Sequence, residues 1–142
     1  MADAPIPQPD KILNYPQNGE LEFLFRKKLT SSDMRTGLIL TSYSNYYLRH
    51  LPRPLLDVIT GDGLTVWCYT PAIHHSGAVL KGHTTYFRFK KTGWEQISAA
   101  NGFLTEQEID CWSLYDAEDG PHGNLRFLIQ SVGDHVVPEE AA

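Results

Sequence analysis

The chain has 142 residues, enough for one domain of ordinary size with short tails. Hydrophobic residues make up 42% and charged residues 20%, which excludes a wholly disordered chain, a collagen and a coiled coil. No stretch approaches the ~20 apolar residues that cross a bilayer, so no membrane partner is expected. Taken over the whole chain, the net charge of -5 argues against a nucleic-acid partner.

Charge is distributed unevenly along the chain. Between residues 20 and 100, Lys and Arg outnumber Asp and Glu, whereas from residue 101 onward Arg126 is the only Lys or Arg. This asymmetry predicts a molecule with one mildly basic part and one acidic end, unless the charges merely follow solvent exposure.

The two ends of the chain differ in composition from the middle. Residues 1–19 are rich in Pro, Asn and Gln without any periodicity, which indicates a disordered leader. They lack the basic start and the apolar run of a secretory signal, so an intracellular protein is expected. Residues 133–142 are expected to form an acidic tail, which leaves residues 20–132 as the folded domain.

Strand patterns dominate the middle of the chain, and several alternate apolar and polar residues at period two. We expect strands at 21–29, 37–41, 64–69, 78–81, 84–90, 109–115 and 125–130. Helical spacing predicts two short helices, one at 43–51 that Pro52 stops and one at 93–101 with Gly102 as its C-cap. Segment 30–33 has turn chemistry and could equally begin a helix. Strands this frequent, without long crossovers, predict a mainly β fold, a barrel or sandwich with helices at its ends.

Cysteine and tryptophan side chains are best explained by packing. Cys68 and Cys111 lie in apolar strand-like runs and are expected to be buried thiols, with a disulfide as the alternative. Trp67, Trp94 and Trp112 fit core positions, although an exposed Trp would be able to stack on a base.

No catalytic or metal site is expected. A metal needs three or four converging ligands, whereas His74 and His75 would point to opposite faces of a strand and His83 lies apart. Neither Ser31 nor Ser32 lies in a G-x-S-x-G elbow. The sequence therefore predicts neither an enzyme nor a cofactor.

Two polar segments that join strands, 30–36 and 81–85, mix hydroxyls, a basic side chain and small residues. Arg and Lys bind phosphates and read guanine, and Ser and Thr bind phosphate oxygens. Such segments are suited to contacting nucleic acid.

Several short motifs follow one another in a characteristic order over residues 20–132. They are FRKKLTSSDM at 25–34, LIL at 38–40, HLP at 50–52, VWCY at 66–69, TYFRFKKTGW at 85–94, NGFL at 101–104 and IDCW at 109–112. In this order the motifs resemble those of the plant B3 (third basic domain) DNA-binding family. The resemblance implies a seven-stranded open pseudobarrel with two short helices.

In that family two loops enter the DNA major groove, an N-terminal arm after the first strand and a C-terminal arm between the fourth and fifth strands. The resemblance therefore implies sequence-specific binding of double-stranded DNA, a role in transcription regulation in a plant nucleus, and other transcription proteins as further partners. The positions that it assigns to DNA contacts are Ser31, Ser32, Arg35 and Thr36 in the N-terminal arm, next to Asp33, then Lys81, His83, Thr84 and Thr85 in the C-terminal arm, and Arg88, Lys90 and Lys91 as neighbouring phosphate contacts.

An alternative function is open at this point. A B3-like barrel can lose DNA binding and serve as a protein-interaction module, because a fold does not by itself fix a function. The acidic end, residues 106–119, would then be the partner surface. Since Arg35 is the one basic residue of segment 31–36, few phosphate contacts and a weak salt dependence are expected for DNA binding.

Overall fold

A computed structural model describes residues 6–72 and 76–132. The elements are, in chain order, β1 (Glu20–Lys28), α1 (Ser31–Thr36), β2 (Gly37–Ile39), α2 (Ser42–Leu48), α3 (Arg53–Thr60), β3 (Leu64–Tyr69), β4 (Ser76–Gly82), β5 (Phe87–Lys90), α4 (Lys91–Asn101), β6 (Glu108–Asp116) and β7 (Asn124–Ser131). The acidic tail predicted at 133–142 and the pair His74 and His75 lie outside the described residues.

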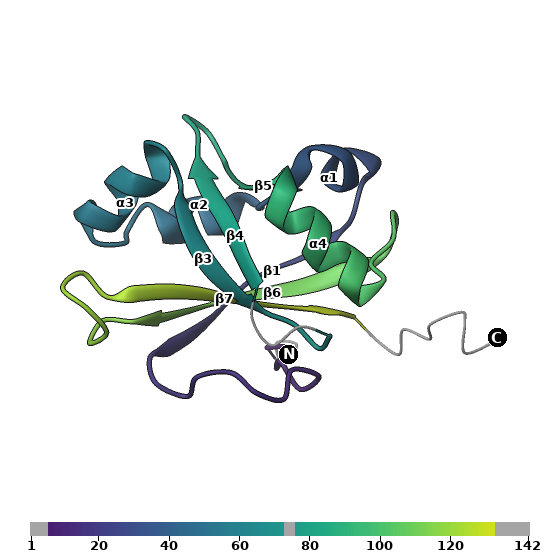
Figure 1. The fold of residues 1–142 in the computed structure, drawn as a ribbon, viewed down its shortest axis with the longest axis horizontal. Coiled ribbons are helices and arrows are strands. Elements are labelled where there is room, and N and C mark those ends of the chain that lie inside the picture. Colours follow the sequence, from purple (N-terminus) through teal and green to yellow (C-terminus); the bar gives the residue numbers. More distant parts are fainter. Residues whose placement is uncertain (1–5, 73–75, 133–142) are drawn as a thin grey trace, which may run out of the picture.

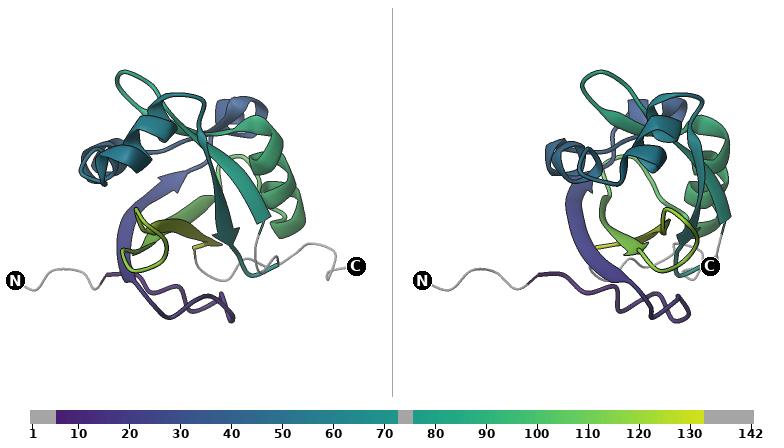
Figure 2. Two further views of the ribbon diagram at one scale, coloured as in Figure 1. Left: turned by 60° about the vertical axis from the view of Figure 1, so that its left-hand side comes forward. Right: turned by 90° about the vertical axis from the view of Figure 1, so that its left-hand side faces the viewer.

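All seven strands belong to one sheet in the order β1-β6-β7-β3-β4-β5-β2, which curls into a half-barrel with the helices around it (Figures 1 and 2). Five of the neighbouring pairs are antiparallel, and β3 runs parallel to β7. The predicted class, a mainly β seven-stranded pseudobarrel, is confirmed. No helix among the described residues is long and apolar enough to cross a bilayer.

The inner side of the curled sheet holds the main hydrophobic core, to which every strand and all four helices contribute. Cys68 and Cys111 lie in this core as free thiols, which confirms the prediction of buried, unbridged cysteines. Burial raises the pKa of the Cys68 thiol to about 12, because the apolar surroundings disfavour the thiolate. Both thiols are therefore packing residues rather than nucleophiles.

The structure has four short helices where two were predicted. Helix α4 ends at Gly102 in the left-handed conformation, as its spacing predicted. Helix α3 was missed because Pro52 was interpreted only as the end of the preceding helix. Pro54 occupies the first turn of α3, where a backbone N–H has no intrahelical partner and proline is tolerated.

Strand β1 does not keep the regular alternation that its sequence suggests. The pairing with β6 shifts between Phe23 and Phe25, so an extra residue, Leu24, bulges from the ladder. Phe25 and Leu24 then both enter the main core, while Phe23 packs on the outer side against Trp112 at a ring distance of 5.7 Å. The bulge thus lets one strand supply apolar side chains to both faces.

The prediction of a disordered leader differs from the structure over residues 6–19. Ile12 is 3% exposed and packs with Trp112, Leu114 and Leu128 on the outer face of β6 and β7. Trp112 Nε1 donates to the carbonyl of Pro7 at 3.0 Å. The side chain of Gln130, in turn, bonds both Lys11 N and the carbonyl of Gln8. Those contacts explain why β6 and β7 are buried on both sides.

The expectation that all three tryptophans are core residues is wrong for Trp67. Trp94 and Trp112 are buried, whereas Trp67 is 47% exposed. Trp67 lies on the face of β3 opposite to Val66 and Cys68, which are buried in the main core.

The packing of the leader makes a testable prediction at two adjacent residues. Ile12→Ala should lower the free energy of unfolding by about 2 kcal/mol, because a buried aliphatic side chain is removed. Leu13→Ala, at a side chain that is 82% exposed, should change it by less than about 0.5 kcal/mol. Urea denaturation followed by tryptophan fluorescence measures both. Equal effects of the two substitutions would show that residues 6–19 do not pack as described.

Candidate nucleic-acid interface

The segment between β1 and β2, which the sequence predicted as an N-terminal arm, is the short helix α1. Its start is a reciprocal cap: Asp33 N donates to Thr30 Oγ1 at 3.1 Å, and Thr30 N donates to Asp33 Oδ2 at 2.9 Å. Such a cap satisfies two of the free backbone donors of the first turn. The helix ends at Gly37, which has a φ of 112° and where a Cβ would collide with the carbonyl oxygen of Phe89. Glycine therefore allows the chain to leave α1 directly into β2.

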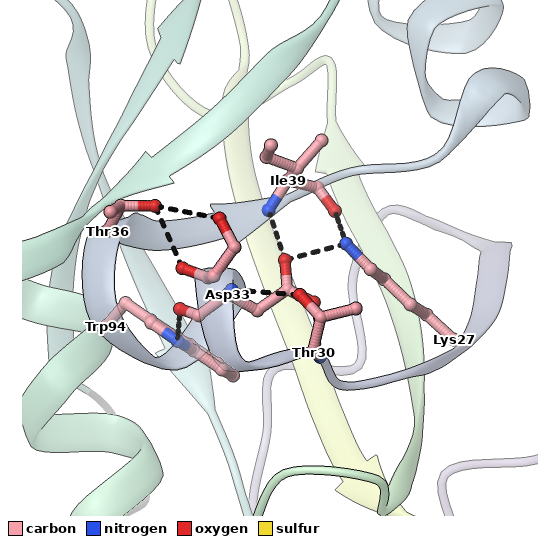
Figure 3. A network of polar contacts seen from close by, with 7 residues as sticks. Lys27, Thr30, Asp33, Thr36, Ile39 and Trp94 are labelled. Atoms are coloured by element: carbon pink, nitrogen blue, oxygen red, sulfur yellow. Dashed lines mark hydrogen bonds and ion pairs between the residues drawn. The ribbon is translucent and has the colours of Figure 1, made fainter.

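Asp33 joins this helix to the rest of the protein (Figure 3). Lys27 Nζ donates to Asp33 Oδ1 at 2.8 Å and to the carbonyl of Ile39 at 2.7 Å, and Trp94 Nε1 donates to the carbonyl of Asp33 at 3.0 Å. The side chain of Asp33 is only 2% exposed. Asp33, which the resemblance placed beside the DNA contacts, is therefore a structural residue whose charge is paired inside the protein.

The other side chains of α1 face solvent. Ser31, Ser32, Arg35 and Thr36 are all exposed. Thr36 Oγ1 donates to the carbonyl of Ser32 at 2.8 Å, so the two hydroxyls lie on one face of the helix. Within residues 6–72 and 76–132, the guanidinium of Arg35 forms no hydrogen bond or ion pair, and it is available to a ligand.

The predicted C-terminal arm is the tight β4–β5 turn at residues 83–86. His83 N donates to the carbonyl of Tyr86 at 2.7 Å, and the His83 ring stacks on Tyr86 with centroids 4.6 Å apart. Thr84 and Thr85 form the exposed tip. Arg49 of α2 donates to the carbonyls of His83 and Thr84.

Strand β5 links the two arms and carries cations on its outer side. Phe87 and Phe89 are buried, whereas the half-buried Arg88 and the exposed Lys90 alternate with them and lie on the other face of the strand. Lys81 of β4 pairs directly with Arg88, so these two cations are neighbours on one face.

Both ends of this cationic row adjoin a predicted arm. At one end Lys90 pairs with Gly37, the residue that follows α1. At the other end lies His83, whose pKa is lowered first by burial and then by the positive charges of Arg88, Lys81 and Lys90. The charges that lower this pKa are all cations, so Lys81, Arg88 and Lys90 lie close enough to the His83 ring to act on it.

Two of the predicted phosphate ligands have protein partners. Lys81 Nζ donates to the carbonyl of Thr60 at 3.1 Å, at the end of α3. Lys91, in the first turn of α4, forms an exposed ion pair in which its Nζ lies 3.9 Å from Glu95 Oε2. An exposed ion pair contributes little energy, so the Lys91 ammonium can still reach an anion.

The two arms lie at opposite ends of the four-residue strand β5, about 13 Å apart at the usual rise of a strand. Figures 1 and 2 show α1 and the β4–β5 turn along the same upper rim of the half-barrel. The fold therefore brings together residues from segments 31–36 and 81–91 that the sequence separates by about half of the domain.

The acidic end does not form one surface. Glu106 and Glu108 lie at the start of β6, and Asp119 follows its far end, about 30 Å away for a nine-residue strand. Asp110, between them, is buried and accepts two hydrogen bonds from Arg26, at 2.8 and 3.0 Å. Asp119 accepts from Asn124 and Arg126, and these hydrogen bonds lower its pKa. The sequence prediction of a single acidic partner surface at 106–119 is therefore wrong.

Sequence reasoning missed the residues that hold the arms in place: Lys27, Trp94 and Arg49. The sequence left open whether segment 30–33 is a turn or begins a helix, and the capping-box spacing of Thr30 and Asp33 favours helix α1. No sequence signal connects Arg49 with a turn 34 residues further along the chain. Among the described residues, no three His, Cys, Asp or Glu side chains gather as metal ligands would.

Comparison with known proteins gives a likeness of fold. No protein-family model matches this chain, and no curated protein matches it. Among solved structures, an Arabidopsis FUS3–DNA complex matches with a TM-score of 0.50 and 18% sequence identity, over 80% of this chain and 99% of that chain. The resemblance to the B3 family that the motifs indicated is confirmed at the level of the fold.

The network around Asp33 predicts a large effect on stability. Asp33→Ala should lower the free energy of unfolding by about 3 kcal/mol, because the Lys27 ammonium loses its buried counter-charge and α1 loses its cap. Asp57→Ala, which removes an exposed helical ion pair with Arg53, should cost less than about 0.5 kcal/mol. Chemical denaturation monitored by circular dichroism compares the two variants. A small effect at Asp33 would contradict a structural role.

Proposed function

We propose that this chain binds double-stranded DNA sequence-specifically, with helix α1 and the β4–β5 turn entering the major groove, and that it regulates transcription in the nucleus of a plant cell. The observation that carries this proposal is the row of cations on the outer side of β4 and β5, which ends at an exposed polar segment on each side. Lys and Arg side chains on such a surface can neutralise the phosphates of a duplex. The polar segments beside the cations can contact base edges.

The residues divide into three roles. Arg35 is the candidate for reading a base edge, because a free guanidinium on an exposed helix can bond guanine O6 and N7 together. Arg88, Lys90 and Lys91 are proposed phosphate ligands, together with Lys81. Small hydroxyl and imidazole groups then fix the register on the duplex: Ser31, Ser32, Thr36, His83, Thr84 and Thr85.

The overall charge of -5 does not oppose this proposal. Asp33, the carboxylate nearest to the arms in sequence, is buried against Lys27. Asp110 and Asp119 are paired with arginines away from β5. The proposed interface is therefore positive although the molecule is negative, and binding should be modest in affinity because few phosphates are contacted.

The likeness to the FUS3–DNA complex supports the proposal, since that protein was solved with DNA and has the same fold. The proposed geometry does not require a second domain or a cofactor. We also propose that the chain binds other transcription proteins.

A substitution at Arg35 tests base reading. Arg35→Ala should weaken binding to a duplex selected from a random pool by about 1–3 kcal/mol, while it should change binding to a scrambled duplex far less. Fluorescence anisotropy at fixed salt measures both duplexes. Arg53→Ala is the matched control, because Arg53 is an exposed arginine that pairs, among the residues that the structure describes, with Asp57. Equal weakening on both duplexes would count against base reading by Arg35.

A substitution at Lys90 tests phosphate binding. Lys90→Ala should weaken binding to every duplex by a similar factor and reduce the slope of log affinity against log salt by about 0.9, since one fewer counterion is released. Titrations at four salt concentrations give this slope, with Arg53→Ala again as the control. An unchanged slope would remove Lys90 from the interface, and a wild-type protein without affinity at low salt would end the proposal.

A further inference from the structure

One side chain of α2 holds the tip of the β4–β5 turn. Arg49 Nη2 donates to the carbonyl of His83 at 2.7 Å and to the carbonyl of Thr84 at 3.1 Å. The guanidinium carbon lies 4.8 Å from the centroid of the Phe87 ring, and Nε donates to Asn45 Oδ1 at 3.1 Å. The side chain thus contacts both sides of the turn and is itself oriented from its own helix.

The turn has few other supports. The bond from His83 N to the carbonyl of Tyr86 closes it, and the bond from Leu40 N to the carbonyl of Phe87 fixes its base. Thr84 and Thr85 project into solvent. A planar guanidinium can bond two successive carbonyls and stack on a ring at once, whereas a lysine ammonium lacks this geometry.

We infer that Arg49 is a positioning residue, which fixes the β4–β5 turn and thereby sets how strictly this chain discriminates among DNA sequences. This inference rests on the proposed function. Thr84 and Thr85 of the turn fix the register in which base edges are read, and base contacts need side chains held within about 0.5 Å of their productive position. Base reading therefore depends on the rigidity of the turn. Phosphate contacts from β5 use long side chains on a paired strand and are independent of Arg49. Loosening the turn should therefore reduce selectivity more than general affinity.

Hydrogen exchange of the protein without DNA tests the clamp directly. In Arg49→Ala, exchange of the His83 amide should accelerate about tenfold, because the closed turn opens more often. Amides between β6 and β7 and the control variant Arg53→Ala should keep wild-type rates. Unchanged exchange at His83 would overturn the inference.

A milder variant covers the case in which Arg49→Ala loosens the whole protein. Asn45→Ala keeps the charge and the length of Arg49 and removes only the acceptor of its Nε. A local acceleration at His83 in Asn45→Ala supports the clamp. Where Arg49→Ala loosens the whole protein, wild-type exchange at His83 in Asn45→Ala overturns the inference.

Binding measurements then separate positioning from a direct charge contact. The probes are a duplex that the wild-type protein selects from a random pool and a scrambled duplex of the same composition. Arg49→Ala should lose about tenfold in affinity for the selected duplex, as for one lost base contact, and less than about twofold for the scrambled one. The salt slope should stay unchanged, and Arg49→Lys should not restore selectivity.

Two other outcomes have distinct meanings. Restoration by Arg49→Lys together with a slope reduced by about 0.9 in Arg49→Ala would make Arg49 a phosphate ligand and overturn the inference. If the wild-type protein selects no duplex, sequence-specific DNA binding is wrong and the role of Arg49 in it falls as well. The exchange data would still decide whether Arg49 holds the turn.

Discussion

The ion pair between Lys27 and Asp33 closes the part of the half-barrel that backbone hydrogen bonds leave open. Strands β1 and β2 are the two edges of the sheet, and no ladder joins them. The Lys27 ammonium bridges this gap by binding Asp33 of α1 and the carbonyl of Ile39 together. Because both partners are largely shielded from water, the pair adds little net energy, but removing either charge would leave the other one uncompensated. The position of α1 on the rim, and with it the spacing of the two proposed DNA-binding segments, depends on this contact.

The same contact decides which charges the rim presents. A helix that begins with Thr30 and Asp33 needs a carboxylate for its cap, and a carboxylate on the outer side would repel phosphate. Turning Asp33 inward satisfies the cap and leaves Arg35 outside. On β5 the period-two alternation also separates core residues from cations. Phe87 and Phe89 fill the core, while Arg88 and Lys90 lie on the opposite face of the strand. Local structural rules therefore place Arg35, Arg88 and Lys90 outside the core of a molecule whose total charge is negative.

The second apolar cluster and the proposed DNA-binding residues lie on different strands of the sheet. Residues 6–19 cover the outer face of β6 and β7 and form a second apolar cluster around Trp112. The cationic row lies on β4 and β5, where Arg88 is half-buried and Lys90 is exposed. Between these regions the sheet is continuous through β7 and β3. A rigid scaffold of this kind suits two short segments, α1 and the β4–β5 turn, whose own hydrogen bonds are few.

Local patterns in the sequence were sufficient for most of the fold. Period-two alternation located the strands, Gly102 located the end of α4, and the apolar runs around Cys68 and Cys111 indicated buried thiols, because each of these signals acts within a few residues. Helix α3 was not predicted, because proline follows the end of many helices and is also tolerated in the first turn of a new one, where Pro54 lies. The bulge at Leu24, the packing of Ile12 and the exposure of Trp67 depend on which segment covers each face, and that is decided by contacts across the chain. Tertiary structure alone also assigned Lys27 and Arg49 their partners, since an ion pair or a hydrogen bond between distant segments leaves no periodic trace in the sequence.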